Sequence, residues 1–264
     1  MNNEIRTGRI TSSEIVALTS NGRTSGSFGE AFYTYVTECV YEIYANRSLE
    51  NQTSSLAMEW GKLCEGYVHK IHLGFEYVMQ SQQTIIHPTI NRWAGSPDGL
   101  KYIDDDIETV TDIKCPLTLK AFMNLVQSLY KLENGVIIPS GLSGDDAIKE
   151  IRKTKDGEKY YWQLVSNACI TGAEYAELIV FMPYIDELED ILAYNAKLSN
   201  DSDDNASFRV SWAKDGELPY LFPERGIKNI NIIRFKVPQE DKEFLTDRVQ
   251  KAVTLIESGY IKLK

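Results

Sequence analysis

The sequence predicts an α/β fold in which a mixed central β-sheet is flanked by helices. Segments with the 3.6-residue period of helices alternate along the chain with short apolar, β-branched segments that are typical of strands. The 264 residues are enough to bury a substantial core, and no internal repeat or convincing linker divides them. We therefore expect one domain over residues 1–264, with a core at about 6–183 and C-terminal helices and a strand at 184–264.

The composition is that of an ordinary globular protein. The hydrophobic fraction is 43% and the charged fraction is 25%, both of which are usual values. The longest apolar runs span only a few residues, whereas a membrane span needs roughly 20, so we expect no membrane association. The formal net charge of −10 argues against a simple basic nucleic-acid binder. The negative charge is unevenly distributed, however, with acidic clusters at residues 104–106, 187–190 and 201–204. A concave DNA-facing surface could therefore still be basic.

The start of the chain and its cysteines bear on location. The first six residues lack the apolar stretch of a secretory signal, and the four cysteines contain no C-x-x-C pair. This spacing argues against a zinc ribbon or an iron–sulfur cluster and fits reduced thiols. We expect a cytoplasmic protein.

The first third of the chain is predicted to be mainly helical. A helix start is expected at residues 11–14 (TSSE), where hydroxyl caps and an acid precede an apolar stripe. A glycine-rich loop is expected at 21–29. Residues 28–44 and 54–74 have helical periodicity. The second of these should direct one stripe of residues to the core, namely Ala57, Trp60, Gly61, Cys64, Val68 and Ile71.

Strands and helices alternate through the rest of the chain. Residues 75–89 and 92–115 are predicted to be strands joined by turns, and Thr118 should cap a helix that reaches Leu129. Residues 134–158 are rich in glycine and charge and are predicted to be a long excursion outside the core. The remaining predicted elements are a helix at 160–171, a strand at 174–182, an amphipathic segment at 185–198, an acidic loop at 199–205, a strand at 229–237 and a helix at 238–258 that Gly259 ends.

Two short stretches carry the candidate chemistry. The motif SPDG presents Asp98 at a turn, and the motif DIKCP presents Asp112 and Lys114 in a β-branched context. Side chains at i and i+2 of a strand share a face, and a hairpin through residues 104–106 would bring Asp98 beside them. Two carboxylates and a lysine at one point suit Mg²⁺-assisted phosphodiester hydrolysis. Taken alone, the first motif is also an ordinary Asp-Gly turn and the second a surface ion pair.

A zinc site is the competing interpretation of the second predicted helix. Glu65, His69 and His72 lie on the flank of its apolar stripe. Three ligands on one helix rarely converge without others, and only His87 remains elsewhere in the chain. The pattern therefore favours a partly exposed polar flank over zinc.

Five motifs in a fixed order give the chain a family resemblance. They are RTGRITSSE at residues 6–14, AMEWGKLCE at 57–65, SPDGL at 96–100, DIKCP at 112–116, and Gln163 within YWQ. Together they resemble the phage lambda exonuclease and YqaJ-like viral recombinase family of the PD-(D/E)XK nuclease superfamily. Its signatures include an R-x-G-x-I-T-A-S-E opening and an A-x-x-W-G-K-x-x-E helix. The resemblance runs from about residue 6 to 183 and is weaker beyond.

The resemblance implies a restriction-endonuclease-like fold and a metal-dependent active site. Asp98, Asp112 and the backbone carbonyl of Ile113 would hold Mg²⁺ as oxygen ligands. Glu65 would hold or orient a second ion through water, and Mn²⁺ would be able to substitute. Asp112 stands where the lambda enzyme has Glu, but Asp-x-Lys is common in the superfamily.

The same resemblance assigns the remaining site residues. Lys114 would orient the attacking water or offset charge on phosphorus, and Gln163 would position that water or a ligand carboxylate. In the family an Arg, two Ser and the motif Lys bind the 5′-phosphate of DNA. The residues here that match those places are Arg6, Ser13, Ser96 and Lys114.

By resemblance we expect a Mg²⁺-dependent 5′-to-3′ exonuclease on linear double-stranded DNA that releases mononucleotides. The 3′ single-stranded tails would serve a phage single-strand annealing protein in recombination inside a bacterial host, and the family's homotrimeric ring is a candidate assembly. A PD-(D/E)XK endonuclease or a non-processive DNA-repair nuclease would share every active-site residue, and a catalytically inactive DNA-binding protein is a third interpretation. We expect Asp112→Ala and Lys114→Ala each to abolish cleavage and to leave thermal unfolding nearly unchanged.

Overall fold

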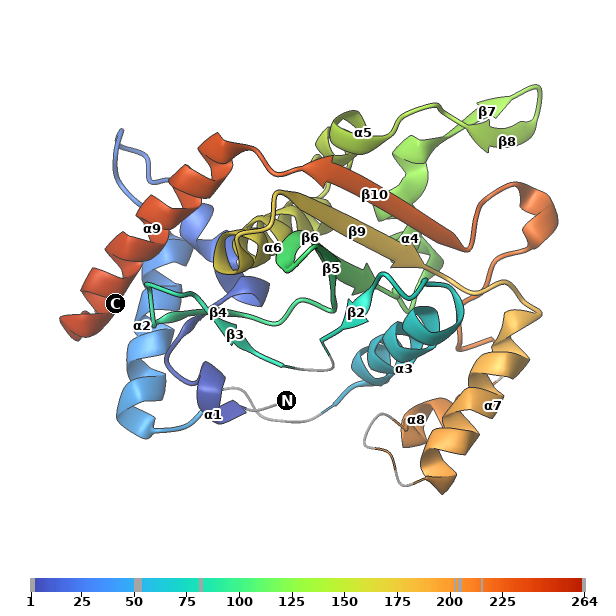
Figure 1. Cartoon of the computed structure of the whole chain (residues 1–264), viewed down its shortest axis with the longest axis horizontal. Helices are drawn as coiled ribbons and strands as arrows, with labels where there is room; N and C mark the ends of the chain where they lie inside the picture. Colours follow the sequence, from blue (N-terminus) through green and yellow to red (C-terminus); the bar gives the residue numbers. More distant parts are fainter. Residues whose placement is uncertain are drawn as a thin grey trace.

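A five-stranded mixed sheet forms the centre of the fold. The computed structural model describes residues 3–49, 54–80, 83–201, 203, 206–214 and 216–262. The sheet order is β10 (Ile230–Lys236), β9 (Tyr175–Phe181), β6 (Asp106–Lys114), β5 (Gly99–Ile103) and β2 (Val78–Met79) (Figure 1). Strands β6 and β9 run parallel and the other pairs run antiparallel. The predicted α/β fold with a mixed central sheet is therefore confirmed.

Smaller sheets and the helices surround this centre. A second sheet has the order β1 (Ile10–Thr11), β4 (Trp93–Gly95) and β3 (Ile85–Ile86), and a hairpin of β7 (Tyr130–Glu133) and β8 (Val136–Pro139) projects from the body (Figure 1). The α-helices are α1 (Asn3–Arg6), α2 (Glu30–Ala45), α3 (Leu56–Ile71), α4 (Leu119–Val126), α5 (Gly144–Ile151), α6 (Lys155–Thr171), α7 (Glu187–Asn200), α8 (Phe208–Ser211) and α9 (Gln239–Glu257). The 3-10 helices are η1 (Ser12–Thr19), η2 (Gln127–Leu129) and η3 (Pro223–Arg225).

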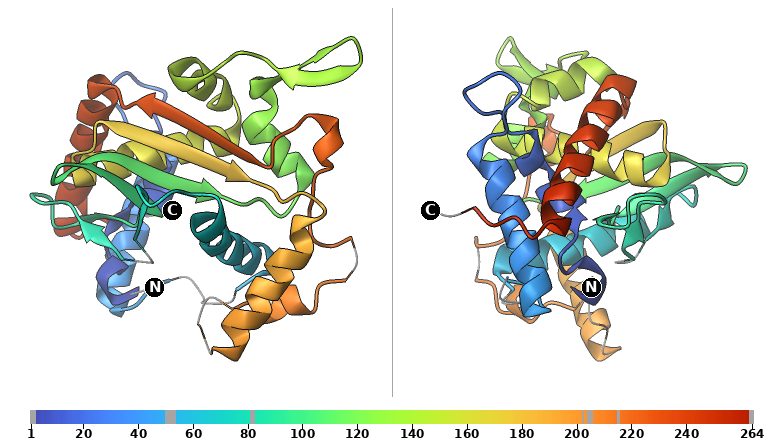
Figure 2. Two further views of the ribbon diagram at one scale, coloured as in Figure 1. Left: turned by 45° about the vertical axis from the view of Figure 1, so that its right-hand side comes forward. Right: turned by 90° about the vertical axis from the view of Figure 1, so that its left-hand side faces the viewer.

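Different helices cover the two faces of the main sheet. Val110 and Leu178 join the hydrophobic cluster that contains α6, whereas Ile113 and Ile179 join the cluster that contains α3 (Figures 1 and 2). Alternate residues of a strand point to opposite faces, so β6 and β9 contribute to both clusters. Asp112 and Lys114 share the face of Val110 and are therefore directed toward α6.

The strongly periodic segments form where the pattern predicts them. Helix α2 occupies the segment predicted at 28–44, and α9 occupies the segment predicted at 238–258. Gly259 follows α9 with φ +70°, a conformation that glycine adopts readily. The Thr118 side chain accepts a hydrogen bond from the Ala121 N–H at 3.2 Å and so caps α4 as expected.

Three predictions in the first part of the chain need correction. Among the described residues of 75–89, only two strands of two residues each form, and Phe75 is fully exposed. The segment after Thr11 is a 3-10 helix, and the Thr11 side chain makes no capping hydrogen bond. The buried stripe of α3 is shifted, because its outer members Ala57 and Ile71 are exposed while Leu63 and Tyr67 are buried.

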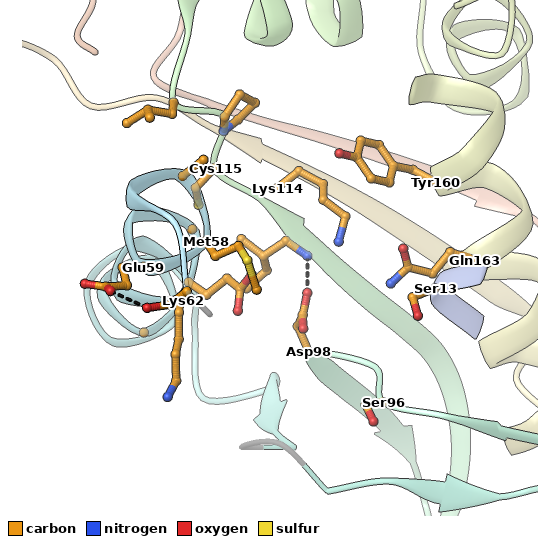
Figure 3. A pocket seen from close by; sticks show the side chains of 18 of the residues that line it. Ser13, Met58, Glu59, Lys62, Ser96, Asp98, Lys114, Cys115, Tyr160 and Gln163 are labelled. Carbon is orange, nitrogen blue, oxygen red and sulfur yellow. Dashed lines mark hydrogen bonds between the residues drawn. The ribbon is translucent and has the colours of Figure 1, made fainter. Parts of the chain in front are cut away.

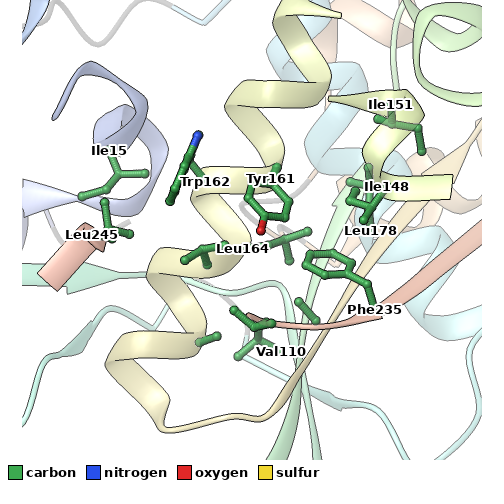
Figure 4. Packing of buried hydrophobic residues seen from close by; sticks show 14 of the residues in the cluster. Ile15, Val110, Ile148, Ile151, Tyr161, Trp162, Leu164, Leu178, Phe235 and Leu245 are labelled. Atoms are coloured by element: carbon green, nitrogen blue, oxygen red, sulfur yellow. The ribbon is translucent and has the colours of Figure 1, made fainter. Parts of the chain in front are cut away.

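The prediction that residues 134–158 lie outside the core is also wrong in part. This stretch contains α5, whose Ala147, Ile148 and Ile151 are buried. Ile148 and Ile151 pack near Tyr161 of α6 and Phe235 of β10 (Figure 4). Spacing of i, i+1 and i+4 places the three apolar residues on one side of the helix, and long-range contacts then hold that side against the sheet.

Two further features bear on the predictions. Part of the acidic loop predicted at 199–205, and of the acidic cluster at 201–204, lies outside the described residues, because 202, 204 and 205 are not among them. Within the described ranges, no helix combines the length and apolar character that crossing a bilayer would require.

Candidate active site

A cleft of about 990 Å³ opens between α3, α6 and the junction of β5 with β6 (Figure 3). All but one of the predicted site residues line it. Those that do are Arg6, Ser13, Glu65, Ser96, Asp98, Ile113, Lys114 and Gln163. The exception is Asp112, which has no exposed surface and lies beneath the cleft floor. The fold thus brings together residues that are up to 157 positions apart in the chain.

Asp98 is fixed at the start of β5 by the end of β6. Its backbone N–H donates to the carbonyl of Thr111 at 3.0 Å, and its Oδ2 accepts a hydrogen bond from the Ile113 N–H at 2.7 Å. The N–H and C=O of one strand residue point to the same edge, so the Ile113 carbonyl also faces the edge on which Asp98 lies. The predicted ligand oxygens of Asp98 and Ile113 are therefore neighbours.

Asp112 holds two of the predicted site residues in place. Its Oδ1 accepts a hydrogen bond from Gln163 Nε2 at 2.9 Å, and its Oδ2 lies 2.6 Å from the Lys114 ammonium. Gln163 comes from α6, which packs against this face of the sheet. The ammonium of Lys114 also lies 5.0 Å from the ring centroid of Tyr160, one helical turn before Gln163.

Glu65 enters the cleft from the opposite side, on α3. Burial raises the pKa of Glu65 to about 7, and the negative charge of Asp112 adds to the rise while Lys114 opposes it. Burial, followed by repulsion from Glu65 and Asp112, also holds the pKa of Asp98 well above its usual range. Three carboxylates therefore repel one another, and the Lys114 ammonium offsets part of their charge.

Lys114 supplies the positive charge that this cluster needs. Burial by itself would lower the pKa of Lys114, but the neighbouring Asp112, Asp98 and Glu65 raise it above its ordinary value. The side chain is 18% exposed and reaches the cleft. Lys114 is therefore charged at neutral pH.

The donor set suits a divalent metal ion in its chemistry. Carboxylate and backbone carbonyl oxygens are the ligands that Mg²⁺ prefers. In the described part of the chain, no three Asp, Glu, His or Cys side chains stand close enough together to hold an ion, and the Lys114 ammonium lies against Asp112 Oδ2. Burial and, after it, repulsion between the carboxylates raise the pKa values of Glu65 and Asp98. A divalent cation would relieve this repulsion, and the residues fit on that ground.

The residues predicted to bind a 5′-phosphate lie along the same cleft. One guanidinium nitrogen of Arg6, at the end of α1, donates to Ser13 Oγ at 3.0 Å. The Ser96 hydroxyl is 3.1 Å from that of Thr84. These positions line the cleft together with Lys114.

Sequence reasoning missed two parts of the cleft wall. Tyr160 lies three residues before Gln163 and so on the same face of α6, a spacing that would have indicated it. Ser207 and Phe208 of the α8 region also line the cleft. No local pattern pointed to them, because they lie more than 40 residues beyond the last motif.

Comparisons with known proteins agree with this architecture. An alkaline exonuclease from Laribacter hongkongensis has 15% sequence identity and a TM-score of 0.53, with 96% of this chain and 90% of that chain covered. The same enzyme in complex with dAMP gives 14% identity, a TM-score of 0.54 and coverage of 97% and 91%. A phage-related exonuclease from Haemophilus somnus 129PT gives 11% identity, a TM-score of 0.60 and coverage of 95% and 94%.

These identities are low, so the structures show a shared fold. A comparison with curated protein sequences gave no match. The family model described as YqaJ-like viral recombinase domain matches residues 3–174, which is well over half of the chain and contains all of the predicted site residues. The chain therefore belongs to the YqaJ-like viral recombinase domain family.

Proposed function

We propose that this protein is a divalent-metal-dependent exonuclease that degrades linear double-stranded DNA from its 5′ ends. The observation that carries the proposal is the convergence of Asp98, Asp112 and Glu65 around Lys114 at the cleft floor. Family membership and the fold shared with alkaline and phage-related exonucleases support a nuclease. The neighbour solved with dAMP supports mononucleotides as the product.

Two Mg²⁺ ions, or Mn²⁺ in their place, would be held by Asp98, Asp112, the Ile113 carbonyl and Glu65. When bound, such ions lower the pKa of a coordinated water and polarise the phosphoryl group. Gln163 keeps Asp112 in one orientation through its 2.9 Å hydrogen bond.

Lys114 has a second task in the proposed reaction. Its ammonium lies 2.6 Å from Asp112 Oδ2, and it reaches the cleft where a phosphodiester would lie. A fixed positive charge in a partly buried site stabilises the negative charge that develops on the phosphoryl oxygens. Removing it should therefore slow the chemical step more than it weakens DNA binding.

Recognition of a 5′ end would use Arg6, Ser13, Ser96 and Lys114. A terminal phosphate carries more negative charge than an internal one, and an arginine with hydroxyl groups binds it by charge-assisted hydrogen bonds. Holding the end in this way would let hydrolysis proceed nucleotide by nucleotide. The resulting 3′ tails would be handed to a phage single-strand annealing protein in a bacterial host, and a homotrimeric ring is the proposed assembly.

The test compares linear and closed circular duplex DNA in the presence of Mg²⁺. We expect release of mononucleotides from linear DNA, with label at the 5′ end released first and label at the 3′ end retained. Asp98→Asn should abolish release, whereas Asp247→Asn on the exposed face of α9 should not. Nicking of closed circles would favour an endonuclease, and release from the 3′ end first would overturn the proposed polarity.

A further inference from the structure

Helix α8 and the residue that follows it expose two large aromatic side chains next to each other. Phe208 and Trp212 are each 73% exposed, and their ring centroids are 5.6 Å apart with 42° between the ring planes. Side chains of this size usually contribute to cores or interfaces. A pair of them left together in solvent therefore indicates a contact with something outside the chain.

The exposure does not come from a loosely attached helix. Val210, between the two aromatics, is buried at 1% exposure in the cluster that contains α3 and α7. The Ser207 hydroxyl donates to Glu59 Oε2 at 2.7 Å, and Arg209 Nε lies 3.1 Å from Glu59 Oε1. Asn195 of α7 pairs with the backbone of Ser207 in both directions. These contacts fix α8 on α3 and α7 while both rings face outward.

Phe208 belongs to the wall of the cleft, and Trp212 packs against Phe208 just outside that wall. Phe208 lines the same cleft as Asp98 and Lys114, and so does Met58 on α3, which is 63% exposed. Figures 1 and 2 show α8 beside α7, on the side of α3 away from the main sheet. An apolar rim on α3 and α8 thus borders the opening through which a DNA strand would reach the cleft floor.

We propose that Phe208 and Trp212 form a stacking platform for unpaired bases of the DNA strand whose backbone enters the cleft. The inference rests on the proposed function and adds a binding surface to it. In the proposed reaction one strand is degraded while the other is left as a single-stranded tail, so nucleotides near the cleft part from their partners and expose their base faces. Aromatic side chains stack on any base, so such a platform works without sequence preference.

The size of the patch favours bases over a protein partner. At 73% exposure, two aromatic side chains offer roughly 300 Å² of surface. A stable protein–protein contact needs about 800 Å² on each partner. The patch is too small for that by itself, whereas it matches one or two stacked bases.

The placement of the tryptophans makes a direct test available. Trp212 is exposed, whereas the other three tryptophans, Trp60, Trp93 and Trp162, are at most 5% exposed. Iodide quenching of fluorescence therefore reports mainly on Trp212. We would titrate the full chain with an oligo-dT of about eight nucleotides, a length within the usual range of single-strand sites, in EDTA so that no hydrolysis occurs.

Binding of oligo-dT should shield Trp212 from iodide and change its emission. Trp212→Ala should remove that signal and raise the Kd for oligo-dT about tenfold, the effect of losing one stacked base. Trp212→Tyr should restore most of the affinity, which a merely structural role would not predict. Phe75→Ala, which removes a fully exposed aromatic that does not line the cleft, should bind as the unaltered protein does.

Two results would overturn the proposal. One is unchanged iodide quenching together with an unchanged Kd for Trp212→Ala. The other is shielding of Trp212 that grows with protein concentration in the absence of DNA, accompanied by self-association in sedimentation, which would make the patch an interface between copies. If oligo-dT shields Trp212 from iodide but the protein hydrolyses no DNA, the stacking platform is supported and the proposed nuclease activity is refuted. If the protein hydrolyses linear DNA but oligo-dT does not shield Trp212, the nuclease activity is supported and the stacking platform is refuted.

Discussion

Replacing Lys114 with methionine is expected to lower the free energy of unfolding of the metal-free protein by about 3 kcal/mol. The ammonium lies 2.6 Å from Asp112 Oδ2, and Asp112 has no exposed surface. Removing one partner of a buried ion pair costs about 3–5 kcal/mol, because the other charge is left buried without compensation. Lys114 is 18% exposed, so the lower end of that range applies. Because methionine keeps most of the aliphatic volume of lysine, the loss of stability should come from the missing charge.

Urea unfolding at pH 7.5 in EDTA measures this loss directly. In a chain of this size, about 3 kcal/mol corresponds to a fall in Tm of roughly 6–12 °C. Added Mg²⁺ should reduce the difference from the unaltered protein, since a cation held by the same carboxylates offsets their repulsion. Cleavage of linear DNA should be abolished with or without this recovery. The expectation from sequence that unfolding would be nearly unchanged is revised, because the pattern did not show how deeply Asp112 is buried.

The matched control is Lys251→Met. Lys251 also pairs with an aspartate, at 2.5 Å, but the side chains of Lys251 and Asp247 are 52% and 55% exposed. Exposed pairs contribute at most about 1 kcal/mol, so this variant should unfold almost as the unaltered protein does. Equal stability of the Lys114 and Lys251 variants in EDTA would refute the reasoning. Normal cleavage by Lys114→Met would refute the assignment of Lys114 to the active site.

Three further predictions concern the core, the DNA end and pH. Ile148→Ala should lower the free energy of unfolding by about 2–4 kcal/mol in urea, whereas Val136→Ala on the exposed hairpin should change it little. Arg6→Ala should reduce the preference for 5′-phosphorylated over 5′-hydroxyl ends, and an equal loss on both would contradict the phosphate site. Burial opposes ionisation of Glu187, but hydrogen bonds from His72 and two other donors lower its pKa from the ordinary 4.5. The ionised Glu187 side chain therefore stabilises the fold above pH 4.5, and this stabilisation is lost as the pH falls below that value. Glu187→Gln should lower the free energy of unfolding by about 1–2 kcal/mol at pH 7, and by less below pH 4.5.

Local sequence patterns were enough to predict the elements that are set mainly by residues nearby in the sequence. Helices α2 and α9 follow from periodicity, and the hairpin of β5 and β6 follows from the acidic turn, where Ile103 pairs with Asp106. That hairpin is also why the proximity of Asp98 to the end of β6 was predictable. The turn position sets the approximate pairing of the two strands, but a bulge between Lys101 and Tyr102 shifts the register by one residue, and no local pattern predicted it.

The failures arise where distant contacts outweigh composition. Residues 134–158 look solvated, yet Ile148 is buried because β10, nearly 90 residues later, provides the surface that covers it. The same reason hid Phe208, which reaches the cleft only because Glu59 and Asn195 hold α8 in place. Neither contact leaves a trace in the local sequence. Asp112 is likewise buried because α6 packs over β6, and the spacing of residues within β6 does not reveal this packing.

The fold and the proposed chemistry are linked through the charge balance of the cleft. Glu65, Asp98 and Asp112 come from a helix, a turn and a strand. Burial and mutual repulsion raise the pKa values of Glu65 and Asp98, so bringing these groups together in their ionised forms opposes folding. A ligand that binds only the folded state stabilises it by RT ln(1 + [L]/Kd). Mg²⁺ should therefore raise the unfolding free energy, and more so in Lys114→Met, where no ammonium competes for the carboxylates. An unfolding curve can thus detect ion binding in a variant that cleaves nothing, which separates the metal site from the reaction it would serve.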